Sequence, residues 1–259
     1  MKKYISLCLL VVCISIPQMV FGWGMIGHRV VGELAQKNLS QQAQKRVDVI
    51  LHHAGVAMVS NWGDFVRSDE NYKGQDDWHY KDMAAGLSRD DFNKEVVTKN
   101  NGEVVFRVLQ LIDLLKKDPN NEVNLKMLIH LIGDMHQPLH MGRPEDKGGN
   151  TLRLKWFGRD ISLHALWDDG LIEYQKLSYT EYADYLWNIH PGSKLKFQRS
   201  MVLDWAWETY RTSQKVYDSF NEASDPYRYN FLYVSLLESR LSLAGEHLAA
   251  VLNYIYGGK

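Results

Sequence analysis

The stretch that decides the fold is "IHLIGDMHQPLH", residues 129–140, in which an apolar run carries three histidines and one aspartate. The apolar spacing predicts a helix that ends before Pro138, because proline has no amide hydrogen with which to continue it. On such a helix His130 and Asp134 lie four residues apart and project from one face, where both can reach one cation. His140 follows the break, where the chain can turn back toward the same place.

The rest of the chain also has mainly helical patterns. Apolar residues at helical spacing predict helices over 28–39, 40–53, 103–117, 122–136, 163–173, 180–189, 199–220 and 228–256. A kink is expected near Gly245 in the last of these. Alternation on either side of Gly158, over 151–163, predicts a small hairpin. We therefore expect an all-α fold, with one mainly helical domain over 23–259 and at most one small β-hairpin.

The first residues differ from the remainder in composition. The chain has 259 residues, 45% hydrophobic and 24% charged, as in a folded globular protein. Residues 1–22 combine a basic start, an apolar run and the small Gly22, the pattern of a removable signal peptide. A membrane anchor is the alternative, which the short apolar run disfavours. Cleavage would leave Trp23 as the N-terminus of a secreted or periplasmic protein, and would remove both cysteines, Cys8 and Cys13. The lack of disulfides in the mature chain suggests a bacterial protein.

The charge balance excludes one class of nucleic-acid binder. The net charge is −1, and removal of Lys2 and Lys3 with the signal peptide makes the mature chain slightly more acidic. Proteins that grip duplex nucleic acid through a basic surface need many phosphate contacts. Any attraction for phosphate must therefore be local.

A second histidine–aspartate pair repeats the spacing of the first. His164 and Asp168 in "LHALWDD" are four residues apart, and the Gly-rich turn "KGGN", residues 147–150, lies between the pairs. Taken singly, either pair is more often a surface ion pair. Two such pairs are harder to obtain by chance, and neutral imidazole with carboxylate suits zinc in a multinuclear hydrolytic site.

Two upstream motifs supply further candidates. "SNWGDFVRSD" places Asp64 and Arg67 within one helical turn, a pair that in isolation is more often a local salt bridge. "DWHYKD" supplies His79, Tyr80 and Asp82. These residue types add an imidazole, an aromatic face and two carboxylates to the set.

The remaining histidines are interpreted as structural. His52 and His53 follow an apolar run at a helix end, where they would complement the helix dipole. His136 fits either a group that supports a metal ligand or a solvated helix end. His190 and His247 are expected to be structural.

One more motif completes an ordered set. "WGMIGH" joins Trp23, whose freed amine and carbonyl can chelate a metal, to His28. In order, "WGMIGH", "WGDFVR", "DWHY", "HLIGDMHQPLH", "GGN" and "LHALWD" resemble the zinc-dependent, single-strand-specific nucleases of fungi and plants, the S1/P1 nuclease family. Zinc-dependent bacterial phospholipases C share the fold of this family. The motifs run from Trp23 to Asp168, and the helical remainder fits the family's size.

The resemblance implies three Zn²⁺ ions, two of them close together. The ligands would be Asp64, His79, His130 and Asp134 for the first ion; Asp134, His28 and the amine and carbonyl of Trp23 for the second; and His140, His164 and Asp168 for the third. Phospholipases of this fold typically have glutamate in place of Asp168, so this residue favours the nuclease branch. Fungal and plant relatives are commonly disulfide-bonded, whereas the mature chain expected here has no cysteine.

The resemblance also implies catalytic and substrate-binding roles. Asp64 would orient the attacking water, and Arg67 would lie next to that water and the phosphate. Tyr80, where relatives often have phenylalanine, would stack a base whose edge is bound by Asp82. Stacking requires an unpaired base, which accounts for single-strand preference. Three divalent cations against three carboxylates leave a local charge of about +3, which supplies the missing phosphate attraction.

Together these features predict an extracytoplasmic zinc-dependent phosphodiesterase. It would hydrolyse single-stranded DNA and RNA to 5′-phosphorylated products and act on 3′-nucleotides. We expect a monomer with no stable protein partner and no membrane contact. The alternatives are a phospholipase C-type phosphodiesterase and a non-catalytic metal-binding protein.

Overall fold

The computed structural model describes residues 22–258, so the predicted signal peptide lies outside the described residues except for Gly22. The described part is mainly helical with one two-stranded antiparallel sheet, which confirms the predicted fold class. The longer helices are α1 (Met25–Lys37), α2 (Gln41–Ile50), α6 (Val104–Lys117), α7 (Glu122–His136), α10 (Tyr179–Ile189), α11 (Met201–Asp218) and α12 (Pro226–Tyr256). The shorter ones are α3 (Val56–Val59), α4 (Trp62–Phe65), α5 (Arg89–Glu95), α8 (Leu163–Ala165) and α9 (Leu171–Tyr174). None of the described helices is both long and apolar enough to cross a membrane.

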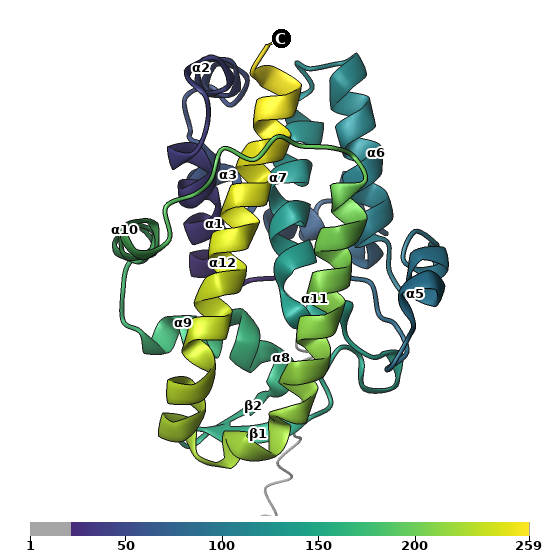
Figure 1. Cartoon of the computed structure of the whole chain (residues 1–259), viewed down its shortest axis with the longest axis vertical. Helices are drawn as coiled ribbons and strands as arrows, with labels where there is room; N and C mark the ends of the chain where they lie inside the picture. Colours follow the sequence, from purple (N-terminus) through teal and green to yellow (C-terminus); the bar gives the residue numbers. More distant parts are fainter. Residues whose placement is uncertain (1–21, 259) are drawn as a thin grey trace, which may run out of the picture.

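Helix α7 lies inside the bundle, between α12, α11 and α6 (Figure 1). It begins at the Asn121 cap, whose side-chain oxygen accepts the amide of Asn124, and it ends at His136 as predicted. All but a few of its residues are buried, which explains why the sequence is apolar on nearly every side of this helix. The burial holds the backbone that carries His130 and Asp134 in a fixed place.

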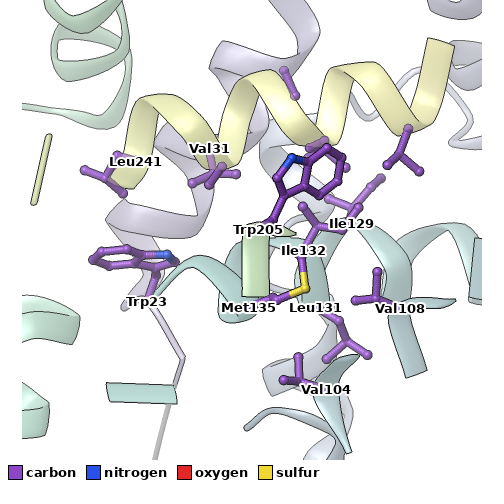
Figure 2. Close-up of a cluster of buried hydrophobic side chains, with 14 of the residues drawn as sticks. Trp23, Val31, Val104, Val108, Ile129, Leu131, Ile132, Met135, Trp205 and Leu241 are labelled. Carbon is purple, nitrogen blue, oxygen red and sulfur yellow. The ribbon is translucent and has the colours of Figure 1, made fainter. Parts of the chain in front are cut away.

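The core around α7 is drawn from helices distant in sequence (Figure 2). Ile129 and Ile132 of α7 are 1% exposed or less, and they lie in one buried cluster with Val31 of α1, Val108 of α6 and Trp205 of α11. Complete burial of an aliphatic side chain of this size contributes roughly 1.5–3 kcal/mol. The same cluster includes Trp23, which joins the start of the described chain to the core.

Several helix boundaries differ from the predicted ones. α1 begins at Met25 rather than at 28, and α2 ends at Ile50 rather than at 53. Beyond α2, His52 and His53 have φ values of 51° and 62°, which no continuing helix allows. α12 runs without a break through Gly245, where a Cβ would lie 2.5 Å from the Cβ of Leu34. This glycine therefore allows close packing of α12 on α1.

The predicted hairpin is present and leads directly into the segment that carries His164 and Asp168. Strands β1 (Arg153–Trp156) and β2 (Arg159–Ser162) pair antiparallel, with Trp156 opposite Arg159. Ser162 then caps α8 by accepting the amide of Ala165 at 3.0 Å. The predicted single helix over 163–173 is divided into α8, a π-helical turn (Leu166–Gly170) and α9, and the π turn carries Asp168.

Candidate metal centre

The buried end of α7 supplies the first two side chains of the centre. His130 and Asp134 are both fully buried, and His130 Nε2 lies 3.1 Å from Asp134 Oδ2. The Nδ1 of His130 donates to the carbonyl oxygen of Ser60 at 2.7 Å. Because a neutral imidazole has one N–H, this bond leaves Nε2 with a lone pair that faces the carboxylate.

Two upstream segments add Asp64 and His79 at the same point. His79 Nδ1 lies 3.0 Å from His130 Nε2 and 2.9 Å from Asp134 Oδ2. Asp64 Oδ1 is 3.8 Å from His130 Nε2 and 4.0 Å from His79 Nδ1. Gly63 on α4 allows this approach, since a Cβ there would lie 2.7 Å from His130 Cγ. Two imidazole nitrogens and two carboxylate oxygens, all of them potential metal ligands, therefore meet at one point.

The start of α1 lies against the other side of Asp134. His28 is 1% exposed, and its Nε2 lies 3.3 Å from Asp134 Oδ1. Its ring stacks on that of His130 with centroids 4.1 Å apart. A Cβ on Gly22 would overlap Asp134 Oδ1 and lie 2.8 Å from His28 Nε2. The bond between Gly22 and Trp23, the proposed cleavage point, therefore lies in the centre.

A third group lies beyond the Pro138 break. His140 Nδ1 donates to the carbonyl of His79, and His164 Nδ1 donates to that of Gly148, both at 2.6 Å. These bonds leave the Nε2 of each ring as the metal-ligand atom, and His164 Nε2 lies 3.3 Å from Asp168 Oδ2. Gly148 has a φ of 63°, a conformation that favours glycine, so the Gly-rich turn orients His164 through its backbone.

The centre as a whole has the composition of a metal site. Among the described residues, three sets place ligand atoms within 4.8 Å of one another: His28, His130 and Asp134; Asp64, His79 and His130; and His140, His164 and Asp168. Imidazole nitrogen and carboxylate oxygen are ligands of zinc and related divalent metals. The donor set therefore fits divalent metal, and every predicted ligand side chain belongs to one of the sets.

The electrostatics of the centre also favour a cation. Burial by itself lowers the pKa of His130. The negative charges of Asp134 and Asp64 have a larger opposite effect, and together they raise this pKa to about 9. Burial, with the negative charge of Asp169, raises the pKa of Asp168 well above its usual value. Without metal, the centre must therefore take up protons to balance its carboxylates. A divalent cation balances the same charge without them.

The three remaining predicted site residues border the centre. Arg67 lies 3.5 Å from Asp64 and 2.9 Å from Asp76 through Nη1 and Nε, respectively. Tyr80 and Asp82 line a pocket of about 280 Å³ that also reaches His164. Burial is the largest of the effects that raise the pKa of Asp82 to about 7, and the charge of Asp146 adds to it. The structure thus gathers all the predicted residues into one region.

Sequence reasoning missed the groups that orient the ligands. Gln137 is fully buried, donates to Asp168 Oδ1 and accepts the amide of Leu139. Its position between His136 and Pro138 in the opening motif was the only available signal. The Gly-rich turn was visible in the sequence, but the roles of the Ser60 and Gly148 carbonyls were not, because any residue supplies a backbone oxygen.

The interpretation of His136 as a solvated helix end is wrong. His136 is fully buried, and its Nε2 lies 2.7 Å from His247 Nδ1, in the α12 helix. The His247 ring stacks on Trp205 with centroids 4.0 Å apart, which supports the structural role expected of His247. Burial, with the charge of Arg240, lowers the pKa of His247 to about 3, so the pair is neutral at ordinary pH.

Comparison with known proteins identifies the family of the chain. The chain matches the S1/P1 Nuclease family over residues 23–257, a range that includes the whole metal centre from Trp23 onward. It is similar to Endonuclease 2 of Arabidopsis thaliana, with 26% identity over 277 aligned positions and 92% of each chain covered. It is also similar to Nuclease S1 of Aspergillus oryzae, with 25% identity over 62% of this chain and 58% of that one. Nuclease P1 of Penicillium citrinum is 26% identical over 56% and 57% of the two chains. The chain therefore belongs to the S1/P1 nuclease family and is a metal-dependent endonuclease.

Proposed function

We propose that the protein is a zinc-dependent phosphodiesterase that cleaves single-stranded DNA and RNA to 5′-phosphorylated products and also acts on 3′-nucleotides. The observation that carries the proposal is the position of the three ligand sets beside the pocket of Tyr80 and Asp82. Three Zn²⁺ ions would be held by the side chains of those sets. The amine and carbonyl of Trp23 would complete the set of His28 and Asp134 after cleavage.

Bound metal would neutralise the phosphate and lower the pKa of a water toward neutrality, so that a nucleophile is available at working pH. Asp64 orients the attacking water. Its side chain is 13% exposed, whereas that of Asp134 is fully buried, so Asp64 is the carboxylate of the two that water can reach. Arg67 then stabilises the negative charge that grows on the phosphate oxygens. Its ion pair with Asp76 holds the guanidinium in place for this task.

The Tyr80 pocket would receive the nucleoside whose 3′ oxygen departs. The Tyr80 hydroxyl donates to Asp77 at 2.9 Å, which fixes the ring while one face borders the pocket. The buried Asp82 Oδ1 has no hydrogen-bond partner among the described residues, so it is available to accept from a base edge. Stacking on an aromatic ring contributes roughly 1–3 kcal/mol per base, and only an unpaired base can enter.

The location of the enzyme follows from the composition of residues 1–22. We propose that this segment directs the chain out of the cytoplasm and is removed ahead of Trp23, which gives a secreted or periplasmic protein. The mature N-terminus would then lie in the metal centre, and export and metal loading would depend on the same cleavage.

The proposal is tested with purified protein that begins at Trp23. The substrates are a single-stranded oligonucleotide, 3′-AMP and phosphatidylcholine in mixed micelles. We expect turnover of the first two, loss on chelation and recovery with zinc. Asp64→Asn removes the water-orienting carboxylate and should lower the rate at least 100-fold. This change in rate corresponds to about 3 kcal/mol of activation free energy. Asp90→Asn, an exposed control, should retain activity. Turnover of the lipid alone would contradict the proposal.

A further inference from the structure

A second groove lies next to the metal centre on the side of Asp64. Its volume is about 420 Å³, and it shares no lining residue with the Tyr80 pocket. Its walls are largely apolar and include Met25, Met58, Trp62 and Phe65. Asp64 lines this groove, whereas His164 lines the other one, so the two cavities meet different parts of the centre.

The apolar wall of the groove is unusually open to solvent. Phe65 is 79% exposed, Met25 69% and Met58 53%. Large apolar side chains gathered at the surface beside a site commonly mark a place where a ligand binds. Asp64 and Phe65 both line the groove, so a ligand that contacts the Phe65 ring lies near the water-orienting carboxylate.

Polar groups in the groove indicate the class of ligand. Arg29 supplies positive charge. The Lys126 ammonium, which also forms an ion pair with Glu122, lies 5.9 Å from the centre of the Trp62 ring. The Asn61 amide donates to the Met25 carbonyl, while its Oδ1 and the Nε of Arg29 have no partner among the described residues. A flat apolar group with polar edges and an attached anion satisfies all of these groups. An acyl chain would leave the Arg29 Nε and the Asn61 amide oxygen unpaired.

We propose that this groove binds the nucleoside on the 3′ side of the scissile phosphate, with its base against Phe65. The inference rests on the proposed function, in which the Tyr80 pocket binds the nucleoside on the 5′ side. The phosphate between them lies at the metal centre, and Arg29 attracts the continuing phosphodiester chain. Both bases must be unpaired to occupy the two cavities, so the second groove strengthens the preference for single strands.

Two substrates distinguish binding in this groove from binding in the Tyr80 pocket. Adenylyl-(3′,5′)-adenosine has a nucleoside on each side of its phosphate, whereas 3′-AMP has one only on the 5′ side. The measured quantity is the ratio of kcat/KM for the dinucleotide to that for 3′-AMP. For Phe65→Ala we expect this ratio to fall about tenfold, the effect of one lost base stack. Phe65→Trp should restore it.

The matched control is Phe231→Ala, because Phe231 is 81% exposed on α12 and outside the groove. This variant should leave the ratio at the wild-type value. An unchanged ratio in Phe65→Ala, or an equal loss on both substrates, would overturn the inference while wild-type activity upholds the proposed function. A selective loss of phosphatidylcholine turnover in Phe65→Ala would overturn it in favour of a lipid. A wild-type enzyme that cleaves neither nucleotide would remove both proposals.

Discussion

Substitution of Gly63 by alanine tests whether His130 occupies the position that metal binding requires. A Cβ at residue 63 would lie 2.7 Å from His130 Cγ and 2.9 Å from Nε2, and closer still to Cδ2, whereas ordinary contacts begin at 3.4 Å. The ring or helix α4 must therefore move by about 1 Å. Neither has much room, since His130 is fully buried and donates to the Ser60 carbonyl.

This displacement exceeds what a metal site tolerates, because metal–ligand distances vary by only about 0.2 Å. Loss of ligand orientation typically lowers metal affinity 10- to 100-fold. Gly63→Ala should thus weaken metal binding at the set of Asp64, His79 and His130 by about 1.4–2.7 kcal/mol. The assay is metal content by atomic emission after dialysis against a series of buffered zinc concentrations.

Gly74→Ala is the control for general destabilisation. Gly74 has a φ of 81° and no atom within 4 Å of a built Cβ, so alanine there costs about 1 kcal/mol of backbone strain without touching the centre. It should lower the melting temperature measured in chelator but leave zinc affinity at the wild-type value. Wild-type zinc affinity in Gly63→Ala would refute the placement of His130 as a ligand.

Three further predictions concern the terminus, the buried histidine pair and the ligand support. A tag left ahead of Trp23 should remove one equivalent of bound metal and most turnover, and unchanged metal stoichiometry would contradict the role of the free amine. His247 has a folded pKa of about 3 against an ordinary value of 6.5, so its stabilising effect is complete above pH 6.5 and is lost as the pH falls toward 3. At pH 5 this loss is about 2 kcal/mol. Denaturant unfolding of metal-free protein measures the free energy of unfolding at pH 7 and pH 5. The decrease in this free energy between the two pH values should be smaller by that amount in His247→Gln than in the wild type, and unchanged in the exposed control His52→Gln. Gln137→Leu should leave Asp168 without its amide donor and lower zinc content, whereas equal zinc binding would show that the amide is dispensable.

The sequence predicts the helices of this fold well where local signals act alone. The pattern over 122–136 gave both ends of α7, because an Asn121 cap and the Pro138 break determine them locally. The prediction of one helix over 163–173 missed the π turn, because apolar spacing does not distinguish one π turn from the α-helix around it.

The site shows a division between local and tertiary information. Pairs such as His130 and Asp134 are visible in sequence because a helix sets their separation. The hydrogen bonds that orient His164 or Asp168 come from distant segments and are visible only in the structure. The groove beside Asp64 could not be predicted from the sequence either, since an exposed phenylalanine has no signature until its neighbours are placed.

Anomalous X-ray diffraction at the zinc absorption edge, on crystals of protein that begins at Trp23, locates the bound metal ions. We expect three peaks, one in each of the sets His28, His130 and Asp134; Asp64, His79 and His130; and His140, His164 and Asp168. Zinc-soaked crystals with peaks only outside these sets, or with none, would contradict this expectation.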